Sequence, residues 1–378
     1  MDFHYLDNSA TTKVSEGAAN KAIELMRHNF GNPSSLHSFG FEAEKELNAA
    51  RQAVAEAIGA KESEIYFTSG GTEANNLALM GVAEAKKRAG KKIVTTAIEH
   101  SSIIDTAKHL ESSGFEVEFV YPKDKNGFDV KDFENAIDEN TILVSVMMTN
   151  NETGLMPPVS KIPAIIKRKN SPALFHIDAV QGLGKENINV TSLKCDLMSI
   201  SAHKIHGAKG VGALYVKKGV RILPRTFGGK QENSLRPGTE ALPLIGAFGV
   251  AAKEINIFEN REKITELNLY LRQQLASFDD IIINSPEDAS PYILNFSARG
   301  IRSETMLHHL SSYGVYISSG SACSKGGKSH VLSALKLNDD LADSAVRVSF
   351  SKESTIKDVD ALLEALEIGL NTLQRKKK

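Results

Sequence analysis

The segment Thr141–Met148 is an unbroken run of apolar and small residues, and it limits the possible folds more than any other part of the sequence. A strand with one wet face alternates apolar and polar residues, whereas a continuously apolar strand is covered on both faces. Short apolar runs alternate with amphipathic stretches from about residue 17 to residue 255. The expected strands span residues 64–68, 92–97, 116–120, 141–148, 173–178, 195–200 and 211–216. The expected helices include residues 17–28, 40–57, 73–89, 101–113, 130–137 and 160–169. This alternation predicts an α/β fold with a mainly parallel seven-stranded sheet and a ligand site at the carboxyl ends of its strands.

The sequence changes character after residue 251, where a long polar helix is expected over 251–277. Shorter strands then mix with helices, as in a smaller α+β domain. The strands are expected at 281–283, 292–297, 315–317 and 345–350, and the helices at 303–312, 329–335 and 355–373. We therefore expect a large domain over residues 16–255 and a small domain formed by residues 1–15 and 256–378. Two domains agree with a length of 378 residues.

Composition excludes several classes of protein. The net charge is −1, so the chain as a whole carries no field that would attract nucleic acid or an anionic membrane. No apolar stretch approaches the roughly 18 residues of a membrane-spanning helix, and the residues that follow Met1 do not resemble a signal peptide. The two cysteines, Cys195 and Cys323, cannot form a disulfide framework, which favours a reducing cytoplasm. We expect no direct nucleic-acid partner and no membrane association.

Ser201–Lys204 places a lysine, a hydroxyl and an imidazole directly after an expected buried strand. A charged amine is costly to bury, so such a lysine readily becomes a neutral nucleophile. This chemistry suits a Schiff base with a carbonyl, above all with pyridoxal 5'-phosphate (PLP). Taken alone, a lysine after a strand is more often a solvent-exposed residue.

Two further segments support a PLP site. Asp178 ends the strand expected at 173–178, where a carboxylate could pair with the pyridine nitrogen, and Gln181 follows within reach of the phenolic oxygen. The alternative for Asp178 is a helix N-cap. In the second segment, Thr68–Asn76, a strand leads into a glycine turn and a helix, with Thr72 as the expected N-cap. Glycines and a helix N-terminus suit a phosphate, and the spacing fits neither a dinucleotide fingerprint nor a Walker loop.

With these residues in place, the chain resembles the NifS/IscS-like cysteine desulfurases, which belong to the class V aminotransferase group of fold-type-I PLP enzymes. The resemblance runs essentially end to end. It rests on the segments Tyr5–Thr12, Phe30–Ser35, Thr68–Glu73, Glu99–His100, Asn150–Gly154, His176–Gln181, Ser201–Lys204, Leu235–Thr239 and Ser318–Cys323. It implies the fold-type-I PLP-transferase architecture, with the catalytic cysteine in the small domain.

The resemblance also implies a role for each matching position. Lys204 resembles the Schiff-base lysine, Asp178 the partner of the pyridine nitrogen and Gln181 the donor to the phenolic oxygen. His100 is similar to the histidine that stacks on the cofactor ring and shuttles protons; without the family it would be read as a polar residue at a helix start. The expected phosphate ligands are Gly71, Thr72, Ser201 and His203, joined by Thr239 from the partner subunit of a homodimer with shared sites.

Substrate contacts and the nucleophile follow in the same way. Asn151 is expected to contact cofactor and substrate, and Asn32 with Arg347 resembles the clamp for the substrate carboxylate. The alternative for Arg347 is an ordinary salt bridge at a strand edge. Cys323, in the Ser- and Gly-rich loop 318–329, resembles the thiolate that takes sulfur from L-cysteine as a persulfide and leaves L-alanine. The sulfur would pass to an acceptor protein, an iron–sulfur scaffold or a tRNA-thiolation enzyme.

The chain departs from the family pattern at three places. The loop that holds Cys323 reaches the next helix about two residues early. Asn233-Ser234 stands where Arg-Gly is usual, and Ala208 replaces a usual proline. Three other functions compete with the desulfurase: a PLP lyase or aminotransferase that does not need Cys323, a cysteine hydrolase that pairs Cys323 with His330 or His100, and a non-catalytic protein of the same fold. Metal binding by His203 with His206, or by His308 with His309, is a weaker alternative than packing or phosphate contact.

Overall fold

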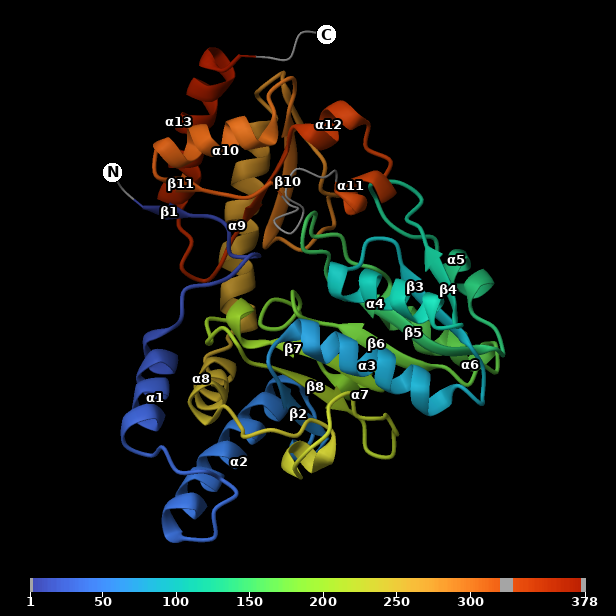
Figure 1. The fold of residues 1–378 in the computed structure, drawn as a ribbon. Coiled ribbons are helices and arrows are strands. Elements are labelled where there is room, and N and C mark those ends of the chain that lie inside the picture. The colour runs from blue at the N-terminus through green and yellow to red at the C-terminus, as the bar shows by residue number, and fades with distance from the viewer. Residues whose placement is uncertain (1–2, 320–328, 375–378) are drawn as a thin grey trace.

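The computed structural model describes residues 3–319 and 329–374, and its centre is the expected seven-stranded sheet (Figure 1). The strand order is β2-β8-β7-β6-β5-β3-β4. Only β8 is antiparallel to its neighbours β2 and β7; the remaining pairs in this sheet are parallel. The strands are β2 (Ile65–Thr68), β3 (Lys92–Thr96), β4 (Glu116–Val120), β5 (Thr141–Met147), β6 (Leu174–Asp178), β7 (Leu197–Ser201) and β8 (Gly212–Val216). The prediction of a mainly parallel sheet is confirmed.

Helices cover both faces of this sheet, as the unbroken apolar strand β5 requires. On β7, Met198 and Ile200 belong to one apolar cluster and Leu197 belongs to another. The second cluster includes residues of α3 (Gly71–Lys86) and α4 (Ser101–Ser112). The first includes residues of the other helices of this region, namely α1 (Glu16–Arg27), α2 (Ser38–Ile58), α5 (Val130–Ala136), α6 (Ile162–Arg168), α7 (Val190–Leu193) and α8 (Leu242–Lys253).

A separate apolar cluster forms the C-terminal part of the fold, which lies above the large sheet in Figure 1. An antiparallel sheet with the order β12-β10-β9 contributes Phe296 and Val346 to this cluster. The strands are β9 (Ile281–Ile283), β10 (Ile293–Ala298) and β12 (Ala345–Ser349). The helices of this region are α9 (Ile257–Leu275), α10 (Ser303–Ser312), α11 (His330–Ala334), α12 (Asp339–Asp343) and α13 (Ile356–Thr372).

The N-terminal segment belongs spatially with this C-terminal part. Strand β1 (His4–Tyr5) pairs in parallel with β11 (Val315–Tyr316), and Leu6 is buried in the C-terminal cluster. We propose the domain division 16–255 and 1–15 with 256–378 because the three larger apolar clusters separate in the same way, while a small fourth cluster joins Ile98 and Met147 to Val331 across the boundary.

Two local predictions were wrong. The single helix expected over 251–277 is two helices, α8 and α9, because Asn256 leaves the helical conformation (φ −128°, ψ 86°) before α9 begins. α8 packs against α1 and α2, whereas α9 contacts α13 and β9, so the chain must change direction between them. Helix α3 begins at Gly71 with Gly70 as its N-cap, so Thr72 is not the cap. Gly70 has φ +155°, which a glycine adopts without strain.

Among residues 3–319 and 329–374, no helix is both long and apolar enough to cross a membrane.

Candidate active site

A cavity of about 500 Å³ lies where strands β6 and β7 end, next to the first turns of α3 and α4. Ten of the residues predicted from the sequence line it: Gly71, Thr72, His100, Asn151, Asp178, Gln181, Ser201, His203, Lys204 and Arg347. They come from sequence positions up to 276 residues apart (347 − 71). The parallel sheet explains the convergence, because the carboxyl ends of neighbouring parallel strands meet at one edge.

Lys204 lies in a short 3-10 turn, Ala202–Lys204, directly after β7. Its Nζ donates to the carbonyl oxygen of Ala10 at 2.8 Å and also to that of Ser9. Both carbonyls belong to the N-terminal segment that lines the cavity. The predicted nucleophilic amine is therefore held at the cavity wall and is not a solvent-exposed lysine.

Asp178 is buried at the end of β6, and two donors fix its carboxylate. The backbone N–H of Val180 donates to Oδ1 at 3.0 Å, and Asn75 Nδ2 donates to Oδ2 at 2.8 Å. Asp178 is thus not the N-cap of a helix. Asn75 lies on α3 four residues after Gly71, so it faces the same cavity one turn further on. The sequence reasoning missed Asn75, although this helical spacing from the glycine turn could have indicated it.

His100 is the N-cap of α4, as the reading without the family expected, and it also lines the cavity, where its predicted role against a cofactor ring stays a prediction. Its Nδ1 accepts from the backbone N–H of Ser102 at 3.1 Å and lies 2.9 Å from Ser102 Oγ. Burial lowers the pKa of His100, and the charges of Lys204 and His330 lower it further, while Asp178 and Asp105 oppose this effect. The ring is therefore disposed to be neutral.

Gln181 is fixed by a second lysine that the sequence reasoning did not single out. Its Oε1 accepts from Lys185 Nζ at 2.8 Å, and its Nε2 donates to the Ser9 carbonyl at 2.9 Å. Lys185 is 5% exposed. Burial, with a smaller contribution from the charge of Lys204, lowers the pKa of Lys185 to about 7. No sequence pattern distinguishes Lys185 from a surface lysine, because its burial arises from packing of distant segments.

The expected phosphate ligands of this chain, Gly71, Thr72, Ser201 and His203, all line the cavity. Gly71 begins α3, and a Cβ built on it would lie 2.6 Å from Val180 Cγ2, so the close approach of these segments requires glycine. Ser201 Oγ is buried without a hydrogen-bond partner among the described residues. His203 Nδ1 lies 3.2 Å from Thr11 Oγ1, and burial with nearby lysines lowers the pKa of His203 to about 4.

Unpartnered polar atoms show that the cavity suits a polar ligand. Six buried side-chain atoms of its wall have no partner within the described part of the chain: Ser9 Oγ, Asn75 Oδ1, Glu99 Oε2, Thr149 Oγ1, Asn151 Oδ1 and Ser201 Oγ. Each such atom costs about 1–3 kcal/mol when it stays unpaired. Burial raises the pKa of Glu99 to about 8, so this carboxyl is mostly protonated at pH 7 and can also donate. A ligand with a ring heteroatom, a hydroxyl and a phosphate fits this set of donors and acceptors.

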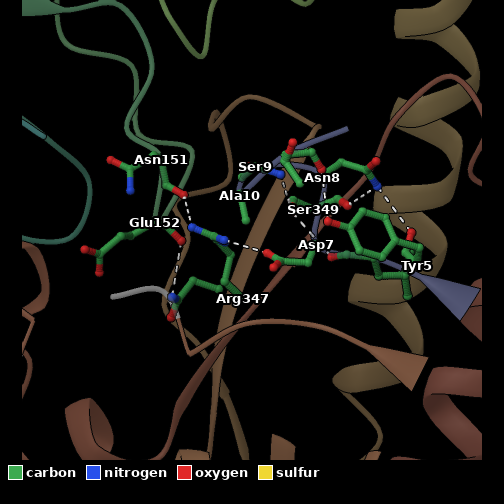
Figure 2. A network of polar contacts seen from close by, with 12 residues as sticks. Tyr5, Asp7, Asn8, Ser9, Ala10, Asn151, Glu152, Arg347 and Ser349 are labelled. Atoms are coloured by element: carbon green, nitrogen blue, oxygen red, sulfur yellow. Dashed lines mark hydrogen bonds and ion pairs between the residues drawn. The ribbon is translucent and has the colours of Figure 1, made fainter. Parts of the chain in front are cut away.

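Arg347 lies on β12 and is one of the residues that line the cavity. Figure 2 shows its contacts with Asp7 and Asn151. Its Nη2 is 2.7 Å from Asp7 Oδ1, and its Nη1 donates to the Asn151 carbonyl at 3.0 Å. Arg347 thus makes the strand-edge salt bridge that the sequence left as an alternative, and it also lines the cavity. The Asn151 carbonyl takes this bond, whereas the side-chain Oδ1 of Asn151 has no partner in the described chain.

Both described ends of the segment 318–329 are attached to the cavity wall. Ser318 pairs with Arg347 through two backbone hydrogen bonds, of 2.6 and 3.2 Å. Ser329 Oγ donates to Glu152 Oε2 at 2.6 Å, and His330 Nε2 lies 2.8 Å from the Glu99 carbonyl. Cys323 itself lies outside the described residues. The described residues that flank this stretch, Ser318 and Ser329, each contact a residue that lines the cavity.

Asn32 and Thr239 do not line the cavity of their own chain. Asn32 is exposed after α1, where its Oδ1 accepts from the backbone of Ser34 at 2.9 Å. Thr239 is exposed after a turn in which Glu232, Asn233 and Ser234 all have positive φ, of 46°, 54° and 62°. The left-handed backbone at Ser234 explains why glycine is the usual residue at the matching position of the resembling family.

Comparison with known proteins agrees with this architecture. Residues 4–362 match the family model of class-V aminotransferases. Cysteine desulfurase IscS of Clostridium botulinum (strain Kyoto / Type A2) is 43% identical over 371 residues, which cover 96% of this chain and 93% of that protein. A solved NifS-like protein has a TM-score of 0.92 at 38% identity and covers 98% of this chain and 100% of its own. The structure of SspA in complex with cysteine has a TM-score of 0.82 at 31% identity, with 93% and 100% covered. The chain therefore belongs to the class-V aminotransferase family and, within it, to the NifS/IscS-like cysteine desulfurases.

Proposed function

We propose that this cysteine desulfurase binds PLP in the cavity and transfers the sulfur of L-cysteine to Cys323 as a persulfide. The observation that carries the proposal is the convergence of Lys204, Asp178 and Arg347 on one cavity whose wall also holds both described ends of the segment 318–329. A solved relative, SspA, is in complex with cysteine, which supports the choice of substrate.

The cofactor residues would divide their tasks by position. Lys204 would hold the cofactor through its amine and then move the α-proton of the substrate. Asp178 would pair with the ring nitrogen, Gln181 would donate to the phenolic oxygen and His100 would cover the ring. Gly71, Thr72, Ser201 and His203 would bind the phosphate. When bound, PLP supplies an electron sink for the substrate.

The sulfur step would use groups on the other side of the cavity. Arg347 would bind the substrate carboxylate together with Asn32 and Asn151, which orients the sulfur toward the incoming thiolate. The Cys323 thiolate would attack the substrate sulfur, so that an S–S bond forms as the Cβ–S bond breaks. The electron pair of the broken bond stays with the carbon fragment, which takes up a proton to become L-alanine. The persulfide would then pass to an acceptor, an iron–sulfur scaffold or a tRNA-thiolation enzyme, in the cytoplasm.

A homodimer would complete the site. Large apolar side chains are exposed on and between α1 and α2, where Asn32 also lies: Ile23, Met26, Phe30, Leu36 and Phe41. Phe227, on the segment that leads to Thr239, is 85% exposed. Several large exposed apolar side chains within one stretch of the chain are a feature expected of an interface. We infer that Thr239 reaches the phosphate of the partner's cofactor and that Asn32 also completes its contacts in the dimer.

The test distinguishes the role of the Lys204 amine, which is to bind the cofactor, from the role of the Cys323 thiol, which is to accept the sulfur. The purified protein should be yellow, and borohydride should fix the cofactor to Lys204. Cys323→Ala should still take up PLP and bind cysteine but should lose cysteine-dependent alanine formation and carry no persulfide. Cys195→Ala is the matched control, because Cys195 is buried away from this cavity and burial raises its pKa to about 12. Full alanine production by Cys323→Ala would reject the desulfurase mechanism and favour a general PLP lyase.

A further inference from the structure

An unbroken series of hydrogen bonds joins Asp178 to His100 through Asn75 and Ser102. Asn75 Nδ2 donates to Asp178 Oδ2 at 2.8 Å and to Ser102 Oγ at 2.9 Å. Ser102 Oγ lies 2.9 Å from His100 Nδ1. The four residues come from β6, α3 and the start of α4, and all four line the cavity.

The direction of each bond follows from the chemistry of its ends. An ionised carboxylate only accepts hydrogen bonds, so the Asn75 group that faces Asp178 must be the amide NH₂. The same NH₂ group donates its second proton to Ser102 Oγ. The Ser102 hydroxyl therefore accepts from Asn75 and has its own proton available for His100 Nδ1.

The helix cap gives an independent constraint on the same nitrogen. The backbone N–H of Ser102 also donates to His100 Nδ1, at 3.1 Å, since His100 is the N-cap of α4. A backbone N–H can only donate, so Nδ1 must carry the lone pair. In the neutral ring the single proton is then on Nε2.

We infer that Asn75 and Ser102 are positioning residues that hold His100 as its Nε2–H tautomer and couple this tautomer to the ionised state of Asp178. The inference rests on the proposed function, in which His100 and Asp178 act on the same cofactor. It deepens that function by stating which ring nitrogen of His100 can give up a proton. His100 then serves the reaction as a donor through Nε2, whereas Nδ1 is reserved for the helix and for Ser102.

Charged and titratable groups around the imidazole must be part of the test. Asp178 and Asp105 favour the protonated ring, whereas Lys204 and His330 disfavour it. None of these groups changes in a Ser102 variant. Any change in the titration of His100 in such a variant therefore comes from the missing hydroxyl.

The experiment follows the ring nitrogens of His100 by ¹⁵N NMR of histidine-labelled, PLP-loaded protein, with the signal assigned by its loss in His100→Gln. The wild type should show the Nε2–H tautomer. Ser102→Ala removes one of two donors that compete with a proton for Nδ1, so the titration midpoint of His100 should rise by about half to one pH unit. Ser102→Thr keeps the hydroxyl and should keep the wild-type midpoint.

Two further variants sharpen the result. Asn75→Leu, which keeps the branching of the side chain but removes its polar atoms, should change both the His100 midpoint and the pH dependence of the cofactor absorbance, because Asp178 loses a donor. Ser112→Ala, at the exposed end of the same helix, should change neither. An Nδ1–H tautomer in the wild type, an unchanged midpoint in Ser102→Ala, or equal shifts in Ser102→Ala and Ser102→Thr would overturn the inference. The proposed function fails on a different result, namely absence of bound PLP or of alanine formation.

Discussion

Replacement of Lys185 by methionine should make the stability of the protein less dependent on pH. Lys185 is 5% exposed, and burial lowers its pKa from 10.5 to about 7. Between about pH 7 and pH 10.5, Lys185 carries a proton in the unfolded chain and does not carry it in the folded chain. Stability therefore rises with pH across this window, and it is lowest below pH 7, where the buried lysine must also be charged.

The size of the effect follows from the two pKa values. One pH unit corresponds to about 1.36 kcal/mol, so Lys185 lowers the free energy of unfolding by about 4 kcal/mol at pH 7 and about 2 kcal/mol at pH 9. Methionine removes this penalty, but it leaves Gln181 Oε1 without its donor, at a cost of about 1–3 kcal/mol. Lys185→Met should thus be more stable than the wild type by about 1–3 kcal/mol at pH 7 and close to equal at pH 9.

The assay is urea unfolding of the PLP-loaded protein at pH 7, 8 and 9. Circular dichroism is the appropriate signal, because the chain has no tryptophan. Lys167→Met, at an exposed position on α6, controls for the loss of one positive charge. If Lys185→Met and the wild type gain stability in parallel from pH 7 to pH 9, then Lys185 is not neutral in the folded protein and the reasoning is wrong.

Two other predictions concern the segment that carries Thr239. Variants Thr239→Ala and Lys204→Ala, each inactive alone, should regain part of the activity when mixed under conditions of subunit exchange, because one of the two composite sites becomes intact; exchange without recovery would count against shared sites. Ser234→Gly should raise the free energy of unfolding by about 0.5–1 kcal/mol. The left-handed φ of +62° costs serine about 1–2 kcal/mol in the folded state, and glycine does not pay this cost. The greater backbone freedom of glycine stabilises the unfolded state by about 0.5–1 kcal/mol, which offsets part of the gain. Chemical denaturation measures this change, and a destabilised Ser234→Gly would refute it.

The sequence predicted those parts of the site that follow from local pattern. Lys204 and Asp178 each end or directly follow a buried strand, and parallel strands bring such positions to one edge. The seven strands of the large sheet were predicted within two residues at each end for the same reason, since periodicity and strand burial are local properties.

The residues that the sequence did not predict depend on contacts between distant segments. Asp7 holds Arg347 across 340 positions of the chain, and Lys185 becomes buried only when the N-terminal segment packs over Gln181. Ser102 resembles any serine in the first turn of a helix until His100 is seen to be the cap. The break between α8 and α9 is of the same kind, because it is set by the different partners of the two helices.

The pairing of β1 with β11 also has a consequence for synthesis of the chain. Residues 4–10 contribute the carbonyls that receive Lys204 and the carboxylate that holds Arg347, yet their own partners lie at residues 315–349. During translation these residues are made before β11 and β12, so they have no strand to join until those later strands have been made. The large sheet can form earlier, because its strands lie between residues 65 and 216. The large sheet can therefore form before the cavity is complete, and we expect the cavity wall to be completed only when β11 and β12 pair with the N-terminal segment.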